Sequence, residues 1–146
     1  TWEDADVRDF AEAIKTAYGS GDPLGLANAV LDVVQQLKHE ADIDNYTKYP
    51  LETLAEGSGD CEDLSVLYAA LMKALGFKVV LLVYEKHVQA AVHLPGVSIP
   101  GGWHVELDGL KYWACETTGN WHANDDRDVG ECPEEYTSAT CRVVEV

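Results

Sequence analysis

The sequence predicts an α+β fold, in which N-terminal helices pack on an antiparallel β-sheet. Apolar residues recur at helical spacing up to Gly76, whereas the chain after Gly76 carries β-prone runs and apolar alternation. The pair Asp108-Gly109 stands between two β-prone stretches, which is typical of a tight β-hairpin. No internal repeat or low-complexity segment interrupts this order.

Three segments of the first half are predicted to be helical. From Asp4 to Tyr18 the apolar residues form one stripe, as in an amphipathic helix. The segment from about Leu24 to Lys38 is apolar on more than one side, so we expect it to be buried between other elements. The third helix runs from Cys61 to Gly76 and carries one apolar face. Between the helices, His39 to Pro50 is predicted to be a loop, and Leu51 to Leu54 at most one helical turn.

The second half is predicted to be mainly β-strand. Lys78–Glu85 holds a continuous run of Val and Leu, as in a central strand. His87–Leu94 alternates between apolar and other residues, which predicts a second strand. A Gly- and Pro-containing loop follows over 95–102. The tail from Gly119 is predicted to be a loop, with a last short strand over 141–146.

A hairpin is predicted between Trp103–Leu107 and Leu110–Thr117, because Asp108-Gly109 suits a two-residue turn. Such a turn fixes the register, so that residues directly opposite each other share a face of the sheet. The predicted pairs are Leu107 with Leu110, Glu106 with Lys111, and His104 with Trp113.

Length and composition indicate one globular domain. A chain of 146 residues is expected to form a single domain, 1–146, with its own core. The longest apolar run, Val79–Tyr84, is far too short to span a bilayer. The chain opens with Thr1-Trp2 and shows no signal-peptide pattern, so we expect either a processed form or a domain of a longer protein. Its localisation and oligomeric state are left open.

The net charge of −16 restricts the partners, because 26 acidic residues face only 10 basic ones. Nucleic acids and anionic membrane surfaces are not expected as partners, since both are bound through Lys and Arg. The acidity itself is explained most simply by solubility.

The four cysteines are too few for a disulfide scaffold, and no C-x-x-C pair occurs. A Cys132–Cys141 bridge is left open. Neither a zinc site nor a calcium loop is predicted, and no nucleotide-binding or metalloprotease motif occurs. We therefore expect no cofactor and no metal.

Cys61 has the setting of a reactive thiol. It follows the glycine-rich stretch 57–59 and a good N-cap, Asp60, with a second acid at Asp63. As the first residue of a helix, it would meet unpaired amides and a helix dipole that favour the thiolate. A small, packed cysteine at a buried helix end is the alternative interpretation.

A cysteine nucleophile needs a base, and the five histidines are the candidates. His39 and His122 lie in predicted loops and are expected to be solvated. His87 opens its strand directly after a turn, where a side chain can face a cleft. His93 lies about 20 Å further along that strand, so only one of the two can reach Cys61. His104 is expected to pack against the tryptophan opposite it.

Glu116 is the candidate for the acid that orients the base, because it ends a strand beside a loop. The preceding Cys115 faces the opposite side of that strand, which argues against a redox pair with Cys61. The other acids considered are expected to lie on the solvated surface: Glu62, Asp63, Asp125, Asp126 and Asp128.

A cysteine at a helix start, a histidine opening a strand and an acid ending a later strand occur here in that order. This order resembles the transglutaminase-like cysteine peptidase superfamily, which has a papain-like fold, and small archaeal and bacterial domains of it in particular. The resemblance covers about Gln35 onward. It rests on Tyr49-Pro50-Leu51-Glu52-Thr53-Leu54, Gly59-Asp60-Cys61-Glu62-Asp63, Leu75-Gly76, His87-Val88-Gln89-Ala90-Ala91-Val92 and Tyr112-Trp113-Ala114-Cys115-Glu116-Thr117-Thr118.

The resemblance implies a role for each of three residues: Cys61 as nucleophile, His87 as general base and acid, and Glu116 as the residue that orients His87. The family usually has Asp-Pro-Thr where this chain has Glu-Thr-Thr, and an aromatic residue where it has Gln89. An oxyanion hole is expected from the Cys61 amide and an upstream donor, for which Gln35 and Tyr49 are the candidates.

The implied activity is a thiol hydrolase that acts on amide bonds of a protein or peptide substrate through an acyl-thioester. Two alternatives stay open on the same fold. An amine in place of water gives a protein-glutamine transferase, and a non-catalytic protein-binding domain needs no reaction at all. Hydrolysis is preferred, because small prokaryotic relatives lack the additional domains of the crosslinking enzymes.

Overall fold

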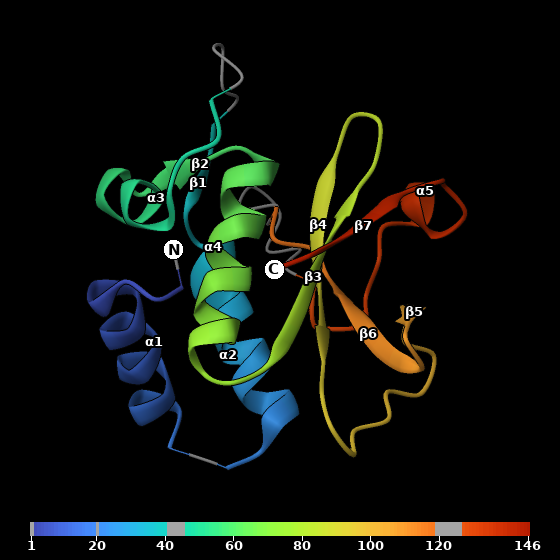
Figure 1. Cartoon of the computed structure of the whole chain (residues 1–146), viewed down its shortest axis with the longest axis horizontal. Helices are drawn as coiled ribbons and strands as arrows, with labels where there is room; N and C mark the ends of the chain where they lie inside the picture. Colours follow the sequence, from blue (N-terminus) through green and yellow to red (C-terminus); the bar gives the residue numbers. More distant parts are fainter. Residues whose placement is uncertain (1, 20, 41–45, 119–126) are drawn as a thin grey trace.

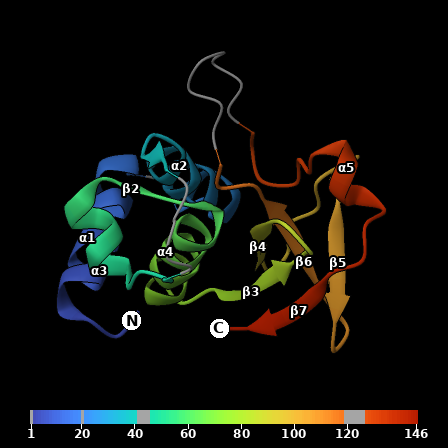
Figure 2. The ribbon, with the colours of Figure 1, turned by 90° about the horizontal axis from the view of Figure 1, so that it is seen from above.

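The computed structural model describes residues 2–19, 21–40, 46–118 and 127–146. Its four N-terminal helices lie on one side of a five-stranded antiparallel sheet, and its short C-terminal helix lies on the other, as Figures 1 and 2 show. The helices are α1 (Ala5–Tyr18), α2 (Pro23–Gln35), α3 (Pro50–Glu56), α4 (Cys61–Ala74) and the short α5 (Glu134–Thr137). The predicted α+β fold, with Cys61 on a central helix packed on the sheet, is confirmed.

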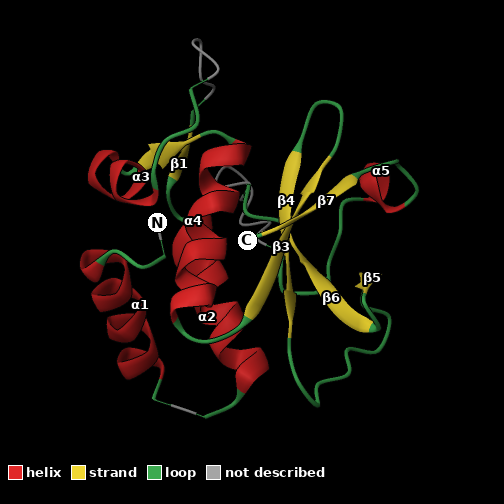
Figure 3. Ribbon diagram, viewed as in Figure 1, coloured by secondary structure: helices red, strands yellow, loops and turns green. Residues whose placement is uncertain are grey.

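The sheet has the strand order β5-β6-β4-β3-β7, with every neighbouring pair antiparallel (Figure 3). Its strands are β3 (Lys78–Val83), β4 (Val88–His93), β5 (His104–Leu107), β6 (Leu110–Cys115) and β7 (Arg142–Glu145). A separate two-stranded parallel ladder joins β1 (Lys38–His39) to β2 (Ser58–Gly59). β3 and β4 are covered by α4, so that their inward side chains join the helices in one core.

The core is built around α4, which lies between the sheet and helices α1, α2 and α3 (Figure 1). Its predicted apolar face is fully buried over 64–72, including Leu64, Leu67 and Leu71, and only Leu75 at its end is partly exposed. Tyr68 of the same face is buried too, and its hydroxyl donates to the Ala27 carbonyl of α2 at 3.2 Å. Burying side chains of this size stabilises the fold by about 1.5–3 kcal/mol each, so the position of Cys61 is set by the best-packed element of the chain.

The β5–β6 hairpin has the predicted register, with Leu107 opposite Leu110 and His104 opposite Trp113. Asp108 and Gly109 have φ angles of 52° and 79°. A two-residue turn with both φ angles positive matches the twist of the strands, which explains why Asp-Gly is found here.

Four parts of the fold differ from the sequence predictions. α2 ends at Gln35, three residues before the predicted end, and α3 has seven residues instead of one turn. Pro50 begins α3, and the Glu52 carboxylate accepts the Tyr49 amide hydrogen at 3.0 Å, which stabilises a helix too short to show a period. Lys38 of β1 was predicted to end a helix, His39 and α5 were predicted as loop, and no strand was predicted where β2 lies, because elements of two and four residues carry no periodic signal.

All four cysteines are free thiols, so the Cys132–Cys141 bridge is not formed in this structure. Within the described part of the chain, no helix has the length and apolarity that crossing a membrane requires.

Candidate active site

The approach to α4 is shaped by two glycines. Gly57 ends α3 with a φ of 70°, a left-handed conformation that glycine adopts without strain. Gly59 lies against the first turn of α4, where a Cβ would come within 2.7 Å of the Asp63 Cβ. Only glycine therefore lets the chain pass this close before it enters the helix.

Asp60 and Asp63 form the capping box that starts α4. The Asp60 carboxylate accepts the Asp63 amide hydrogen at 2.8 Å, and the Asp63 carboxylate accepts the Asp60 amide hydrogen at 3.1 Å. Asp63 was expected on the surface but is buried, since its other oxygen accepts the Lys48 amide hydrogen at 2.8 Å. These bonds fix the backbone on either side of Cys61.

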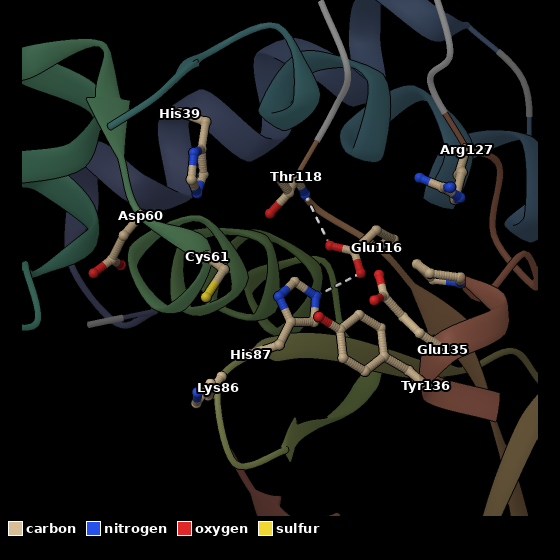
Figure 4. Close-up of a pocket in the computed structure, with 11 residues that line it drawn as sticks. His39, Asp60, Cys61, Lys86, His87, Glu116, Thr118, Arg127, Glu135 and Tyr136 are labelled. Carbon is tan, nitrogen blue, oxygen red and sulfur yellow. Dashed lines mark hydrogen bonds and ion pairs between the residues drawn. The ribbon is translucent and has the colours of Figure 1, made fainter. Parts of the chain in front are cut away.

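Cys61 is the first residue of α4 and is half-buried. Its side chain lines a cavity of about 520 Å³, together with His87 and Glu116 (Figure 4). The amide groups of a helix's first turn have no intrahelical partner and carry the positive end of the dipole. The cavity therefore opens onto a thiol in an environment that favours negative charge.

His87 and Glu116 form a largely buried pair that lines this cavity beside Cys61. The distance between Nε2 of His87 and Oε2 of Glu116 is 2.6 Å, and their side chains are only 12% and 2% exposed. The other Glu116 oxygen accepts the Thr118 amide hydrogen at 3.1 Å. Both carboxylate oxygens are therefore held, and the imidazole is fixed with its second nitrogen free to face Cys61 (Figure 4).

Strand pairing explains why these two residues meet. Ala90 of β4 lies opposite Cys115 of β6, which brings the residue after β6 beside the start of β4. The turn before β4 is closed by a hydrogen bond from the Tyr84 amide to the His87 carbonyl at 2.8 Å. Glu116 thus reaches His87 through a non-local pairing that the sequence does not specify.

The pKa of His87 is raised to about 9 by its partners. Burial, the largest single effect, lowers this pKa, but hydrogen bonding to Cys61 and Glu116 and their negative charges outweigh it. His87 therefore keeps a proton at neutral pH, in contact with a thiol on one side and a carboxylate on the other.

Tyr136 covers the imidazole and was not identified from the sequence. Its ring, on α5, stacks on His87 with ring centroids 4.4 Å apart and an interplanar angle of 11°. The Tyr84 ring packs in turn against Tyr136, with 4.9 Å between the two ring centroids. A ring in this place limits water access to the His87–Glu116 pair, and α5 had no periodic pattern that could have indicated it.

The structure does not bring the two predicted oxyanion donors to the cavity. Gln35 is buried, and its Nε2 donates to the carbonyls of Glu116 and Arg127 at 2.9 and 2.7 Å, so both amide hydrogens are used. Tyr49 is 63% exposed and lines a different pocket, beside Trp2. Both assignments are therefore corrected: Gln35 ties α2 to the strand end that carries Glu116, and Tyr49 is a surface residue.

Of the remaining histidines that the structure describes, only His39 lines the cavity. His93 is bound to the Lys111 carbonyl at 2.9 Å, and His104 packs on Trp113 with centroids 5.0 Å apart, as predicted. His39 is exposed, but it lines the cavity with Cys61, which its predicted place in a loop did not indicate. His122, Asp125 and Asp126 lie outside the described residues.

Cys115 is fully buried in the core on the side predicted by strand alternation. Burial raises the pKa of its thiol to about 12, despite a contact with the Tyr68 hydroxyl. A thiol in this position is inert, which argues against a redox pair with Cys61.

The model of the transglutaminase-like superfamily matches residues 9–107 of the 146. The chain belongs to this superfamily. The matched range contains Cys61 and His87, whereas Glu116 lies beyond it. The superfamily and the papain-like fold expected from the sequence are thereby confirmed.

Several solved structures are similar to this chain at low sequence identity. A structure described as a TGase, with no organism named, has a TM-score of 0.53 and 16% identity over 89% of this chain and 34% of its own. A proposed protease from Parabacteroides distasonis has a TM-score of 0.52 and 12% identity over 88% of this chain and 28% of its own. LapG from Legionella pneumophila has a TM-score of 0.48 and 16% identity over 85% of this chain and 80% of its own. A search of curated proteins found no match.

Proposed function

We propose that this transglutaminase-like domain is a thiol hydrolase that cleaves amide bonds of a protein or peptide through Cys61, His87 and Glu116. One observation carries the proposal. Cys61 at a helix N-terminus, His87 with a pKa of about 9 and the buried Glu116 at 2.6 Å from His87 meet at one cavity of about 520 Å³. Nucleophile, base and orienting acid are the three parts that cysteine-dependent acyl transfer needs.

The proposed reaction starts from a Cys61 thiolate beside a protonated His87. The sulfur attacks the carbonyl carbon, the C–S bond forms, and the π electron pair moves to the oxygen. The C–N bond then breaks, and the leaving amine takes the proton from His87. Water attacks the thioester and gives a proton to His87, and the acid product leaves as the C–S bond breaks.

Glu116 acts on His87 in this scheme and not on the substrate. Its carboxylate stabilises the imidazolium and fixes the ring orientation through the Nε2 hydrogen bond. The longer side chain of Glu, compared with the Asp usual in the family, is accommodated because the Thr118 amide binds its second oxygen.

A cleavage assay tests the proposal. The protein is incubated with a glutamine-containing protein and a labelled primary amine, and new N-termini, released ammonia and incorporated label are measured. Hydrolysis predicts new termini or ammonia without incorporated label, all lost in Cys61→Ala. Cys132→Ala is the matched control, because Cys132 is also a half-buried free thiol but does not line the cavity.

Incorporated label that is lost in Cys61→Ala would replace the hydrolase with a transferase on the same residues. Products that persist in Cys61→Ala would contradict the proposed site.

A further inference from the structure

One hydrogen-bond donor for a developing oxyanion, the Cys61 amide, is identified at the cavity, and the second donor is not yet assigned. The Cys61 amide, at the first position of α4, points its hydrogen out of the helix without an intrahelical acceptor. Efficient acyl transfer needs at least one more donor aimed at the oxyanion. Gln35 cannot serve, since both amide hydrogens are bound to carbonyls, and Tyr49 lies elsewhere.

His39 is placed beside the nucleophile by the backbone. β1 and β2 are paired so that His39 lies opposite Gly59, two residues before Cys61. The ladder is held by hydrogen bonds from the Lys38 amide to the Gly57 carbonyl at 3.1 Å and from the Glu40 amide to the Gly59 carbonyl at 2.9 Å. The position of His39 is therefore fixed to the same two-residue ladder that leads into α4.

The side chain of His39 faces the cavity. It lines the same wall as Asp60 and Cys61, and Figure 4 shows the imidazoles of His39 and His87 on different sides of Cys61. An imidazole carries an N–H donor in both its neutral and its charged form. It can therefore donate from the side of the thiol that His87 leaves open.

The other donors that line the cavity lie elsewhere in it. Thr118 and Tyr136 are beside Glu116 and on the face of the His87 ring, respectively. Lys86 is exposed on the turn before β4, next to His87 in the chain. Arg127 lies beyond Glu116 in Figure 4. His39 is thus the described donor on the Asp60 side of the thiol.

We propose that His39 is a catalytic residue that donates a hydrogen bond to the oxyanion, together with the Cys61 amide. This inference rests on the proposed function of Cys61 as nucleophile. It assigns His39 to the transition state and not to the formation of the thiolate, which remains the task of His87.

Two reagents separate these tasks. When iodoacetamide alkylates a thiolate, the C–S bond forms as the C–I bond breaks, and no oxyanion develops. When p-nitrophenyl acetate acylates it, the C–S bond forms as the π pair moves to oxygen, and collapse of this oxyanion expels p-nitrophenolate. The ratio of the acetylation rate to the alkylation rate at Cys61, determined by peptide mapping, therefore reports the oxyanion donor alone.

We expect His39→Ala and His39→Phe to lower this ratio about 100-fold, the usual effect of losing one oxyanion donor. His39→Gln, which keeps an N–H donor, should retain a larger part of the ratio than His39→Phe, which keeps only the ring shape. His93→Ala is the matched control, because His93 lies outside the cavity and should leave both rates unchanged.

An unchanged ratio in His39→Ala, whether both rates stay the same or both fall equally, would overturn the assignment. Failure of the proposed function has a different signature: Cys61 of the unsubstituted protein would then be alkylated no faster than Cys132 and Cys141.

Discussion

Replacing Glu116 by Gln should lower the pKa of His87, because it removes the negative charge closest to the imidazole. The substitution keeps the size of the side chain and an oxygen that can accept either the His87 or the Thr118 hydrogen bond. Glu116 is 2% exposed, and its Oε2 lies 2.6 Å from Nε2 of His87, so solvent screens the interaction little. The change therefore tests the charge with minimal change in packing.

The size of the effect follows from the pKa of about 9 and its causes. An opposite charge in contact shifts a pKa by about one to three units, and the ordinary pKa of His is about 6.5. Since Cys61 shares in raising the His87 pKa, Glu116→Gln should not remove the whole shift. We expect the pKa of His87 to fall by about one to two units, to between about 7 and 8.

The assay is an NMR titration of the His87 ring proton on Cε1, assigned by its absence in His87→Gln. It needs no substrate. Glu135→Gln is the matched control, because Glu135 lines the same cavity but is exposed and is not among the main groups that shift the His87 pKa. The reasoning is refuted if the unsubstituted protein titrates near 6.5, or if the two Gln variants move the pKa equally.

Three further predictions concern the parts of the molecule that hold the site. Gly59→Ala should lower the free energy of unfolding in urea by about 1–3 kcal/mol, because the new Cβ would lie 2.7 Å from the Asp63 Cβ. Gly21→Ala, whose Cβ would meet open space, should leave the free energy of unfolding unchanged. Equal effects of the two substitutions would disprove the packing argument. Tyr136→Ala should lower stability by about 1 kcal/mol and slow hydrolysis, whereas Tyr136→Phe should retain both, since stacking on His87 needs only the ring; similar losses in both variants would count against this role. Because the pKa of His87 is raised in the folded state, its ionisation stabilises the protein fully below about pH 6.5 and ceases to do so as the pH rises through about 9. The difference in unfolding free energy between the unsubstituted protein and His87→Gln should shrink across that range, and a constant difference would contradict the assignment.

The parts of the fold that the sequence predicted are those with local signals. The apolar stripe and the Asp60 cap specify α4, and Asp108-Gly109 specifies a turn whose register follows from its length. Cys61 could be identified as a candidate because the signals for the N-terminus of its helix lie within a few residues of it. Non-local geometry carried no such signal.

The errors at the site arise from contacts between distant segments. His39 is exposed, as its predicted place in a loop implied, but only the pairing with Gly59 brings it to the cavity, and a two-residue strand has no period that could show this. Gln35 was selected as an upstream donor, but its amide is used by two carbonyls 81 and 92 residues away in the chain. Tyr136 reaches His87 from a four-residue helix near the C-terminal end of the described chain. None of these contacts follows from spacing along the sequence.

The central claim is that Cys61 is held as a thiolate by His87, and the pH dependence of its alkylation tests this most directly. An ordinary thiol, with a pKa of about 8.5, is only about 1% thiolate at about pH 6.5. Native protein is treated at that pH with a limiting amount of iodoacetamide, and the label is located by peptide mapping. Loss of the pairing with His87 lowers the thiolate fraction of Cys61 up to about 100-fold. A more basic thiolate is a stronger nucleophile, which raises its rate of alkylation by about tenfold and so offsets part of this loss.

We therefore predict that Cys61 takes most of the label, ahead of the half-buried Cys132 and Cys141, and that His87→Ala slows its labelling by at least about tenfold. Equal labelling of the three thiols, or a rate at Cys61 that is unaffected by His87→Ala, would contradict the account.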